Sequence, residues 1–319
     1  MKKSPLVRTT AYLTLSVVII IMVYPFIWMF FSTFKSNPEI YRPTQLLPEA
    51  FTTQYYDELM SWNAAEVVAL RDQAIQLRRK AEQTLESSAL IRKADELEEH
   101  ARVLSRTDYF PFKTVFINSL LIAFFQAVFA VVLAATCAYV LARFAFKGKN
   151  ILIALVILVI LVPKQLLAVP TLGWFAWLGL TDSMFGLILS GMLSGIGVIY
   201  FIQIFKQLPE DLSDTARLEG AGELRIFLIH LPLVKSALLT FGLLHFMLAW
   251  HDHLLPLLLL QSQDNLTLPL ALNQLLGSSM RYPRAVLLAG ALFTIIPVAL
   301  LFAVLYRHIR SGLRDFVQH

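Results

Sequence analysis

Residues 114–142 read TVFINSLLIAFFQAVFAVVLAATCAYVLA and contain no charged side chain. A run of about 20 apolar residues is long enough to cross the hydrocarbon core of a bilayer as an α-helix. Lipid cannot satisfy backbone polar groups, so a crossing segment is either such a helix or one strand of a closed barrel. The run does not alternate apolar and polar residues, which excludes a barrel strand. The sequence therefore predicts a transmembrane helix here.

Five more runs of this kind lie along the chain, two of them interrupted by one charge (Lys164 or Asp252): 9–34, 150–181, 183–205, 236–263 and 285–306. Charged residues make up 15% of the 319 residues, whereas soluble proteins average roughly 25%. The mean hydropathy is +0.65. These values indicate an all-α integral membrane protein with six transmembrane helices.

The first run follows Lys2, Lys3 and Arg8, as the core of a signal peptide does. However, it is longer than such a core, no cleavage site of small residues ends it, and it continues through YPFIWMFF (24–31). We therefore expect a transmembrane helix that is retained.

Lys and Arg are unevenly distributed between alternate loops. The N-terminus, the loops 143–149 and 206–235, and the tail after residue 306 carry thirteen, and the short loops of the other set carry six. Because positively charged loops stay in the cytoplasm, both termini and the loop 206–235 are expected there. The single cysteine, Cys137, cannot form an internal disulfide.

A charged insert, residues 57–108, lies on the expected outer face. It holds eleven acids and eight bases, so its net charge is −3 while the rest of the chain carries +8. Apolar residues recur at steps of four and three: Leu70, Ala74, Leu77 and Ala81, then Leu90, Ala94, Leu97, Ala101 and Leu104. The phase changes near Ser87 and Ser88, which fits two packed helices or one helix with a stutter, and we expect a hairpin. The insert is either a docking surface for an extracytoplasmic partner or a solvated decoration that packs on itself.

The expected organisation therefore has four parts: 1–35, the cytoplasmic N-terminus and first helix; 36–112, an extracytoplasmic segment that includes the insert; 113–307, a core of five helices with the loop 206–235; and 308–319, a basic cytoplasmic tail.

Polar residues are concentrated in the cytoplasmic loop DTARLEGAGELRIFLIHLP (214–232). Pro209 suits the first turn of a helix, Glu210 and Asp211 favour the positive end of its dipole, and Gly220 supplies a stop. The loop thus predicts a short surface helix with a face of small residues, which another protein can approach closely.

This loop resembles the cytoplasmic loop of permease subunits in binding-protein-dependent ABC importers, which carries E-A-A-x-x-x-G-A and, further on, Leu-Pro. The matching residues are Asp214, Thr215 and Ala216 on E-A-A, Gly220 and Ala221 on G-A, and Leu231 and Pro232 on Leu-Pro. Asp stands for Glu, Thr for the first Ala, and Glu219 for the usual Asp before Gly.

Nearly the whole chain outside the insert is similar to the second permease subunit of maltose-type carbohydrate importers. The stretches that carry this likeness are YPFIWMFFSTFKSNPEIY (24–41), NSLLIAF (118–124), AYVLARFAFKGKN (138–150), GLTDSMFGLIL (179–189), AWHDHLLPLLLL (249–260), TLPLAL (267–272) and YRHIRSGL (306–313).

The resemblance implies the type I ABC importer permease fold, in the inner (plasma) membrane of a prokaryote, and a transport subunit rather than an enzyme. It implies three kinds of partner: a second permease subunit that completes a heterodimer, two ATPase subunits, and an extracytoplasmic solute-binding protein. A helix over 214–222 would convert closure of the ATPase into movement of the transmembrane helices. Its expected ATPase-coupling residues are Asp214, Thr215, Ala216, Arg217, Glu219, Gly220, Ala221 and Gly222.

The sequence contains no G-x-x-x-x-G-K-[ST] phosphate-binding motif. The nearest stretch, FKGKN (146–150), has Arg143 where the first Gly should fall and no Ser or Thr after the Lys. We therefore expect this chain to bind no cofactor, and ATP and Mg²⁺ to be bound by the partner ATPase. No nucleic-acid partner is expected; membrane lipid is.

Asp252 lies inside an apolar run, where an ionisable residue usually faces the bundle interior or a cavity. Its neighbours His251 and His253 point in different directions on a helix, so we expect no metal site. The family pattern here is W-N-D-F, which Trp250 and Asp252 match and the two histidines do not. Asp252 either shapes the translocation path or holds a bend near Pro256.

The full set of candidates for the translocation path is Asn118, Gln126, Trp250 and Asp252. The alternative for the polar members is a hydrogen bond between helices with no role in transport. The solute is expected to be a sugar or oligosaccharide, with a polyol or glycerol phosphate as the alternative.

Two other classes of protein fit the sequence less well. A membrane enzyme acting on lipids needs converging polar residues at one face of the membrane, whereas the acids that cluster outside the insert do so in the loop 206–235. A secondary transporter usually carries internal repeats, and six helices show none.

Overall fold

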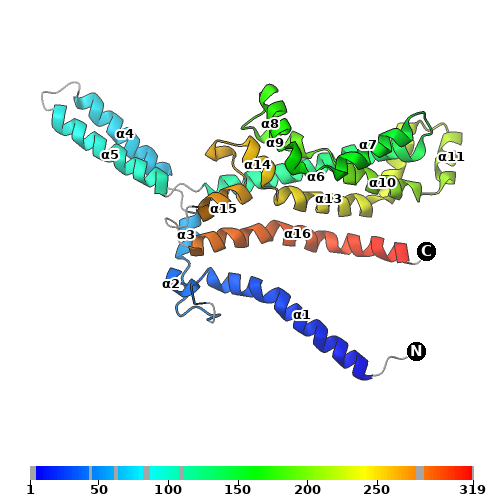
Figure 1. Cartoon of the computed structure of the whole chain (residues 1–319), viewed down its shortest axis with the longest axis horizontal. Helices are drawn as coiled ribbons and strands as arrows, with labels where there is room; N and C mark the ends of the chain where they lie inside the picture. The colour runs from blue at the N-terminus through cyan, green and yellow to red at the C-terminus, as the bar shows by residue number, and fades with distance from the viewer. Residues whose placement is uncertain are drawn as a thin grey trace. The chain divides into compact units, whose positions relative to one another are not determined.

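The computed structural model describes residues 5–42, 45–60, 64–81, 87–107, 111–277 and 284–317, and every regular element in these ranges is helical (Figure 1). The elements are α1 (Pro5–Ser32), α2 (Asn37–Ile40), α3 (Gln54–Met60), α4 (Ala64–Ala81), α5 (Ser87–Thr107), α6 (Phe112–Arg143), α7 (Lys149–Leu161), η1 (Lys164–Leu167), α8 (Ala168–Trp177), α9 (Met184–Gly191), α10 (Gly195–Lys206), α11 (Glu210–Leu218), α12 (Glu223–Leu233), α13 (Lys235–Trp250), α14 (Leu254–Leu259), η2 (Gln263–Asn265), α15 (Leu268–Gly277) and α16 (Arg284–Val317).

The chain divides into two compact units. The first combines residues 1–113 with 272–294, and the second combines 114–271 with 295–319. The second unit contains α7 to α14 and most of α6. It holds both the expected ATPase-coupling residues and the candidates for the translocation path.

In the described part of the chain, three helices are long and apolar enough to cross a membrane: Thr9–Ser32 within α1, Phe112–Arg143 (α6), and Arg284–Val304 within α16. Three pairs of shorter helices pass the same test together and are bent at their breaks: α7 with η1 and α8 by 93°, α9 with α10 by 45°, and α12 with α13 by 77°. If each bent pair makes one crossing, the structure accommodates the six predicted crossings.

The fifth crossing differs from the predicted run 236–263. α13 ends at Trp250, and α14 starts only after a turn in which Asp252 Oδ1 accepts a hydrogen bond from the backbone N of Leu254 (3.1 Å). Instead, α12 and α13 together are long and apolar enough for one bent crossing, although α12 was expected inside the cytoplasmic loop. Its sequence ELRIFLIHLPL is mostly apolar, so the polar part of that loop is shorter than expected.

The break between α9 and α10 is stabilised by side chains from two other helices. Gln126 Nε2 on α6 donates a hydrogen bond to the carbonyl of Leu187 (2.7 Å), and His245 Nε2 on α13 donates one to the carbonyl of Gly191 (3.0 Å). Ser194 caps α10 by accepting from the backbone N of Gly197 (3.2 Å). Since a broken helix in a membrane must satisfy its freed carbonyls within the protein, these bonds allow the bend.

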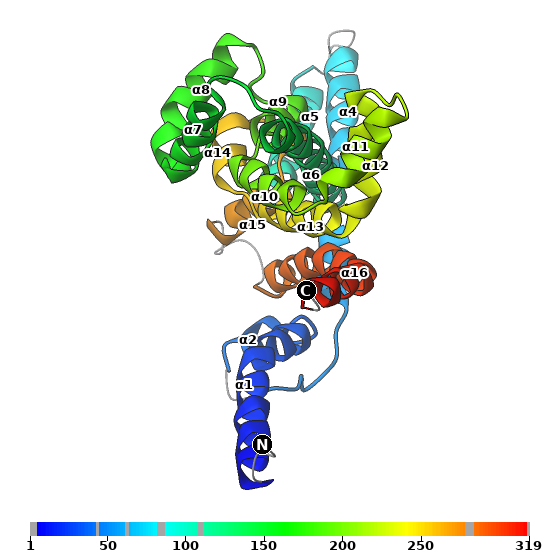
Figure 2. The ribbon, with the colours of Figure 1, turned by 90° about the vertical axis from the view of Figure 1, so that its right-hand side faces the viewer.

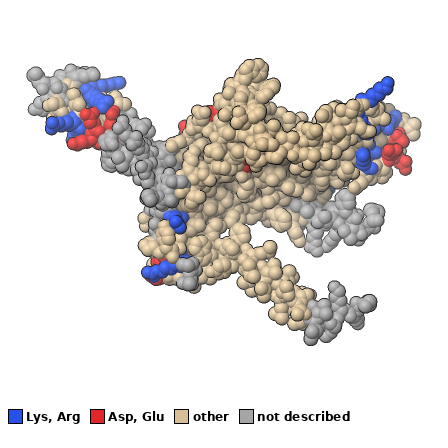
Figure 3. Space-filling view, in the orientation of Figure 1, with Lys and Arg blue, Asp and Glu red and all other residues tan. Residues whose placement is uncertain are grey.

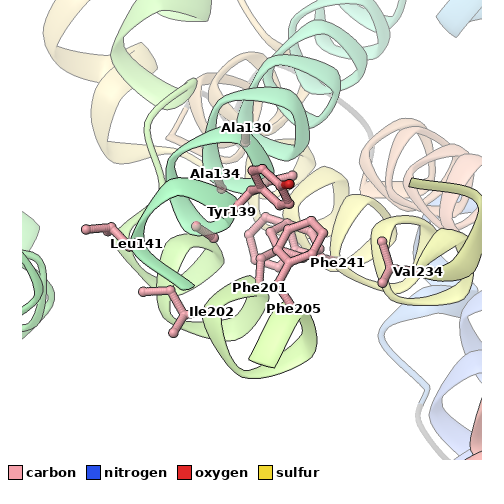
Figure 4. Close-up of a cluster of buried hydrophobic side chains, with 11 residues drawn as sticks. Ala130, Ala134, Tyr139, Leu141, Phe201, Ile202, Phe205, Val234 and Phe241 are labelled. Carbon is pink, nitrogen blue, oxygen red and sulfur yellow. The ribbon is translucent and has the colours of Figure 1, made fainter. Parts of the chain in front are cut away.

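The core of the second unit forms where α6 meets α10 and α13, and both views of the ribbon show these helices side by side (Figures 1 and 2). Alanines on α6 face aromatic rings, among them Phe201 and Phe241, which pack edge to face 5.2 Å apart (Figure 4). A Cβ added at Gly197 would lie 2.5 Å from the ring of Phe241 and 2.9 Å from Cβ of Ala134. Small residues thus permit the close helix approach that is typical of membrane proteins.

The end of α1 leads into a folded segment that contains FKSNPEI (34–40), the last part of the stretch 24–41 that carries the family likeness. Lys35 is completely buried; its Nζ donates to the carbonyl of Gln45 and lies 5.8 Å from the ring centre of Trp28. Glu39 accepts hydrogen bonds from Ser36 Oγ (2.8 Å) and from the backbone N of Glu49 (3.3 Å). Both charged side chains of the stretch therefore fasten the chain where it leaves the first crossing.

The insert is a hairpin of α4 and α5, which pack against each other (Figure 1). Ala74, Ala81 and Ala94 are buried between the two helices, as their spacing predicts. Arg78 joins them through Asp95 (2.9 Å) and Glu98 (2.9 Å). The structure thus agrees with the two-helix interpretation. The side chains of Ala101 and Leu104 and the residues 82–86 lie outside the described part.

Candidate functional site

The polar loop folds as predicted at its start. Pro209 precedes α11, Glu210 and Asp211 occupy the first turn, and Arg217 lies in the last turn. These positions place negative charge at the positive end of the helix dipole and positive charge at its negative end.

α11 ends in a Schellman turn. Gly220 has φ 81°, its backbone N donates to the carbonyl of Arg217 (2.9 Å), and that of Ala221 donates to Ala216 (2.9 Å). A left-handed residue after the last turn favours glycine, because glycine has no Cβ to clash. The observed helix, α11, therefore starts and ends four residues before the expected range 214–222, and residues 219–222 form the turn that separates α11 from α12.

Two of the expected ATPase-coupling residues, Asp214 and Arg217, form an ion-pair bridge with Glu223 on α12. Arg217 Nη1 lies 3.0 Å from Asp214 Oδ1, and Arg217 Nε lies 3.0 Å from Glu223 Oε1 on α12. The hydrogen bond to Glu223 and then the attraction of the two carboxylates raise the pKa of the Arg217 guanidinium. These ion pairs are exposed and weakened by the surrounding water, so they orient α11 against α12 more than they stabilise the fold.

The tip of this loop is open to a partner. Leu218 is 90% exposed and Leu224 is 73% exposed, while a Cβ added at Gly220 or Gly222 would contact nothing within 4 Å. In the space-filling view, charged side chains gather over this end of the second unit, whereas its middle is almost free of them (Figure 3). The exposed leucines and the two glycines leave room for another surface to approach this tip closely.

The inner face of α11 is fastened to the helices behind it by two residues that sequence reasoning missed. Ser213 and His230 are buried, and Ser213 Oγ lies 3.4 Å from His230 Nε2. His230 Nδ1 lies 2.9 Å from the carbonyl of Ile226, which only accepts, so Nδ1 carries the proton and Nε2 accepts from the Ser213 hydroxyl. The ring of Tyr139 on α6 lies 5.8 Å from that of His230. The available signal was a histidine directly before Leu-Pro in an apolar stretch.

Each candidate for the translocation path has a partner inside the chain. Asn118 Nδ2 donates to the carbonyls of Asp264 (2.7 Å) and Leu266 (3.2 Å). Gln126 and Asp252 make the bonds described above. Trp250 is 1% exposed and stacks on Phe246 with ring centres 5.9 Å apart. The bonds of Asn118 and Gln126 to other segments fit the alternative role, and the local bond of Asp252 fits a bend near Pro256. A role in transport stays a prediction for all four residues.

The polar cavity beside these residues is small. It has a volume of about 10 Å³ and is lined by Ser119, Ile122, Gln126, Leu187, Ala249, Asp252, Pro256 and Thr267. That volume suits about one water molecule and excludes a sugar. Two larger hollows of about 580 and 290 Å³, on either side of α6, are lined almost wholly by apolar side chains.

Within the described ranges, no three His, Cys, Asp or Glu side chains lie close enough together to hold a metal ion. His245 and His251 each bond a backbone carbonyl, at 3.0 and 2.9 Å.

Residues 127–315 match the family described as "Binding-protein-dependent transport system inner membrane component". The arabinooligosaccharides transport system permease protein AraQ of Bacillus subtilis is 35% identical over 199 residues, which is 62% of this chain and 70% of that protein. The inner membrane ABC transporter permease protein YcjP of Escherichia coli is 28% identical over 316 residues, 98% of this chain and 96% of that one. The sn-glycerol-3-phosphate transport system permease protein UgpE of Yersinia pestis is 30% identical over 207 residues, 64% of this chain and 74% of that one.

Among solved structures, a chain of a bacterial ABC transporter involved in the import of the acidic polysaccharide alginate has the same fold. The TM-score is 0.70 at 18% sequence identity, and the alignment covers 96% of this chain and 99% of that chain.

Proposed function

Because the chain belongs to the family of binding-protein-dependent transport system inner membrane components, we propose that it is the permease subunit of an importer for a sugar or oligosaccharide. The family describes multi-pass inner membrane proteins that work with an ATPase and a solute-binding protein, and such a subunit moves solute without being an enzyme itself. The likeness to AraQ, an arabinooligosaccharide permease protein, favours a sugar as the solute.

The coupling element in this proposal is α11 with its Schellman turn, the observation that carries the proposal furthest. Leu218 is exposed at its end, and Ser213 ties its other face to His230 and so to Tyr139 on α6. A force applied to the exposed tip therefore has a packed route to a membrane-crossing helix. The ion pairs of Arg217 with Asp214 and Glu223 would hold the end of α11 in a fixed orientation relative to α12. ATP and Mg²⁺ would be bound by the partner ATPase.

The proposed partners are a second permease subunit and two ATPase subunits, with lipid around them. The apolar window of α1 is entirely unburied within the chain, and the two apolar hollows on either side of α6 are open to another apolar surface. The polar cavity is too small for a sugar, which supports a pathway completed by a second subunit.

The proposed orientation puts both termini and α11 in the cytoplasm. Two groups of contacts support it. Arg143 Nη2 donates to the carbonyl of Leu208 (2.7 Å), which joins two loops that were both expected inside. Asn118, near the outer end of the expected crossing 114–142, bonds the carbonyl of Asp264 in a segment that was expected outside. The two loops that Arg143 joins, 143–149 and 206–235, are among the loops rich in Lys and Arg, as expected for the cytoplasmic side.

Glycerol phosphate is the second candidate solute, because the match to UgpE covers 64% of this chain and the match to AraQ covers 62%. The two solutes differ in charge. Titrating the purified binding protein of the system with neutral oligosaccharides and with sn-glycerol 3-phosphate, and following its melting temperature, separates them: a rise with the phosphate alone would replace the sugar proposal.

The coupling role is tested by crosslinking. In a Cys137→Ala background, which removes the single cysteine, Leu218→Cys is treated with a bifunctional thiol reagent in native membranes and partners are identified by mass spectrometry. We expect a crosslink to an ATPase subunit and copurification of a related permease. Leu244→Cys is the matched control, since Leu244 is exposed on α13 and away from α11. Equal crosslinking of both positions to the ATPase, or of neither, would contradict the proposed coupling surface.

A further inference from the structure

Asp182, in the turn between α8 and α9, is held in an unusual way. Its φ is 52°, and it is the one non-glycine residue with positive φ in the described part of the chain. Asp tolerates this region better than most residues because its short side chain can form local hydrogen bonds. A residue in a sparsely populated conformation persists when the surrounding contacts determine it.

Those contacts come from the segment 259–265, about 80 positions further along the chain. Oδ1 of Asp182 accepts hydrogen bonds from the backbone N of Gln261 (2.9 Å), from the backbone N of Ser262 (3.0 Å) and from Ser262 Oγ (3.0 Å). In return, Asn265 Nδ2 donates to the carbonyl of Asp182 (2.6 Å), and the backbone N of Asp182 donates to the carbonyl of Leu259 (2.6 Å).

The same segment is bonded to the first turns of α6. Asn118 donates to the carbonyls of Asp264 and Leu266, and Ser119 Oγ accepts from the backbone N of Leu268 (2.6 Å). Both side chains are buried, with 6% and 3% of their surface exposed. The segment 259–268 is therefore bonded on one side to Asp182 and on the other to α6.

Apolar packing supports these bonds. Ile122 on α6, Leu187 on α9, and Leu259 and Leu260 at the end of α14 form one buried cluster. Hydrogen bonds to an ionised carboxylate are roughly twice as strong as neutral ones. The bonds from Gln261 and Ser262 lower the pKa of Asp182 to about 2, so its carboxylate is ionised at physiological pH.

We propose that Asp182 is the positioning residue of a rigid clasp, made of residues 118–119, 182 and 259–268, that moves as one body during transport. Separating its parts would break all of these hydrogen bonds and expose the apolar cluster, so alternating access opens the outer side at the edge of the clasp and not within it. The inference rests on the proposed transport function and orientation for its role in the cycle; the clasp itself rests on the contacts alone.

The first test keeps Asp182 and locks the clasp. Thr181→Cys lies next to Asp182, and Gln261→Cys replaces a residue whose backbone N bonds Asp182. Both changes are made in the Cys137→Ala background, and a short bifunctional maleimide joins the two thiols in the complete transporter reconstituted in vesicles. We expect the crosslinked complex to import solute at the rate of the same complex before crosslinking, within about twofold. Arrested import with ATP hydrolysis retained would overturn the proposal, because it would show that the two loops must part.

The second test removes the carboxylate. Asp182→Ala should lower import by at least about tenfold, as expected when charged hydrogen bonds are lost, and Asp182→Asn should fall between it and the wild type because its amide oxygen still accepts. Gln263→Ala is the matched control in the same loop, since Gln263 is exposed. The Thr181→Cys/Gln261→Cys crosslink should restore import in Asp182→Ala. Normal import by Asp182→Ala, or no rescue by the crosslink, would contradict the positioning role.

The clasp is distinguished from the transport function by amide hydrogen exchange on the same complex. The backbone N–H groups of Gln261 and Ser262 should be protected in the resting and in the nucleotide-bound state, and should exchange faster in Asp182→Ala. If the wild-type complex imports nothing while this protection is present, the proposed function fails and the clasp stands. If the protection is lost in one of the two states, the clasp fails.

Discussion

At Gly186 the backbone of α9 passes directly against the preceding turn. A Cβ built there would lie 2.2 Å from the carbonyl oxygen of Leu180, a backbone atom that no side-chain rotation can move away. The close approach lets the chain reverse between α8 and α9 and brings Asp182 to its partners. A single hydrogen atom in place of a side chain thus determines the course of this turn.

We expect Gly186→Ala to destabilise the protein by about 1–3 kcal/mol, the usual cost of inserting a methyl group into a filled space. The matched control is Gly173→Ala in α8, where an added Cβ meets nothing within 4 Å and the helix should gain about 0.5–1 kcal/mol. The thermal midpoint of the purified protein, followed as loss of the monodisperse fraction in detergent, measures both. Similar shifts in both variants would show that the approach to Leu180 is not the cause.

The pH dependence of stability follows from Asp182. Its pKa is lowered to about 2 in the folded protein, whereas an unperturbed Asp titrates near 3.9. A carboxyl group with a lowered pKa stabilises the fold at all pH values above about 4, and this contribution is lost as the pH falls toward 2. We therefore expect the wild type to melt above Asp182→Asn at pH 6, with a difference that shrinks from pH 4 downward. A difference that grows on acidification would contradict the assignment.

At this scale the sequence revealed residue types but not partners. Asp182 stands in the stretch GLTDSMFGLIL, yet its partners lie about 80 positions away, and hydrogen bonds over that separation leave no periodic pattern. Ser213 and His230 are 17 positions apart on two helices. Asn118 and Gln126 were recognisable as buried polar residues, but their acceptors are backbone carbonyls, which every residue has.

The helices of the polar loop act as a pair. α11 and α12 are joined by the ion pairs of Arg217 on their exposed side and by the bond between Ser213 and His230 on their buried side. The buried bond matters more, because water does not replace a lost partner there.

We expect Ser213→Ala to destabilise the protein by about 1–3 kcal/mol, since His230 Nε2 would stay buried without its donor. Thr136→Ala is the control, because the Thr136 hydroxyl is exposed and bonds the carbonyl of Val132 within its own helix (2.8 Å). Thermal midpoints of the two variants should differ clearly. If Ser213→Ala melts with the control, the hydroxyl does not hold α11 in place.

The positions of the crossing helices could be predicted from the uncharged runs, because hydropathy depends on local composition. The bends within the crossings could not be predicted from these runs. The run 150–181 was expected to form one crossing, and it turns by 93° between α7 and η1. At this break Val162 is extended and Pro163 cannot donate a backbone hydrogen bond. A proline signals a break in a helix, whereas the direction of the bend depends on packing against other helices.

For the whole molecule, composition alone indicated the membrane class, the crossings and the charged insert. The insert packs on itself: its buried alanines and the pairs of Arg78 lie within α4 and α5. The likeness to YcjP spans 98% of this chain. Whether the hairpin also binds an extracytoplasmic partner depends on a surface that pattern and composition do not specify.

Because the hairpin is closed on itself, replacing residues 62–105 with a short flexible linker should leave the thermal midpoint of the remaining protein within a few degrees of the wild type. Import at saturating and at limiting binding protein should be measured on the same variant. Unchanged import at both concentrations identifies a decoration, whereas a defect confined to limiting binding protein identifies a docking surface. A large loss of thermal stability would contradict the self-contained packing.

The bonds that stabilise the break between α9 and α10 also determine an order of events during synthesis. Gln126, which donates to the Leu187 carbonyl, lies on a helix that leaves the ribosome before α9. His245, which donates to the Gly191 carbonyl, is synthesised more than fifty residues after Gly191. The eight residues of α9 are too short to cross the bilayer by themselves. The hydrogen bond to the Gly191 carbonyl therefore cannot form until the fifth crossing has been translated, and of the two bonds from other helices the break has only the one from Gln126 before then.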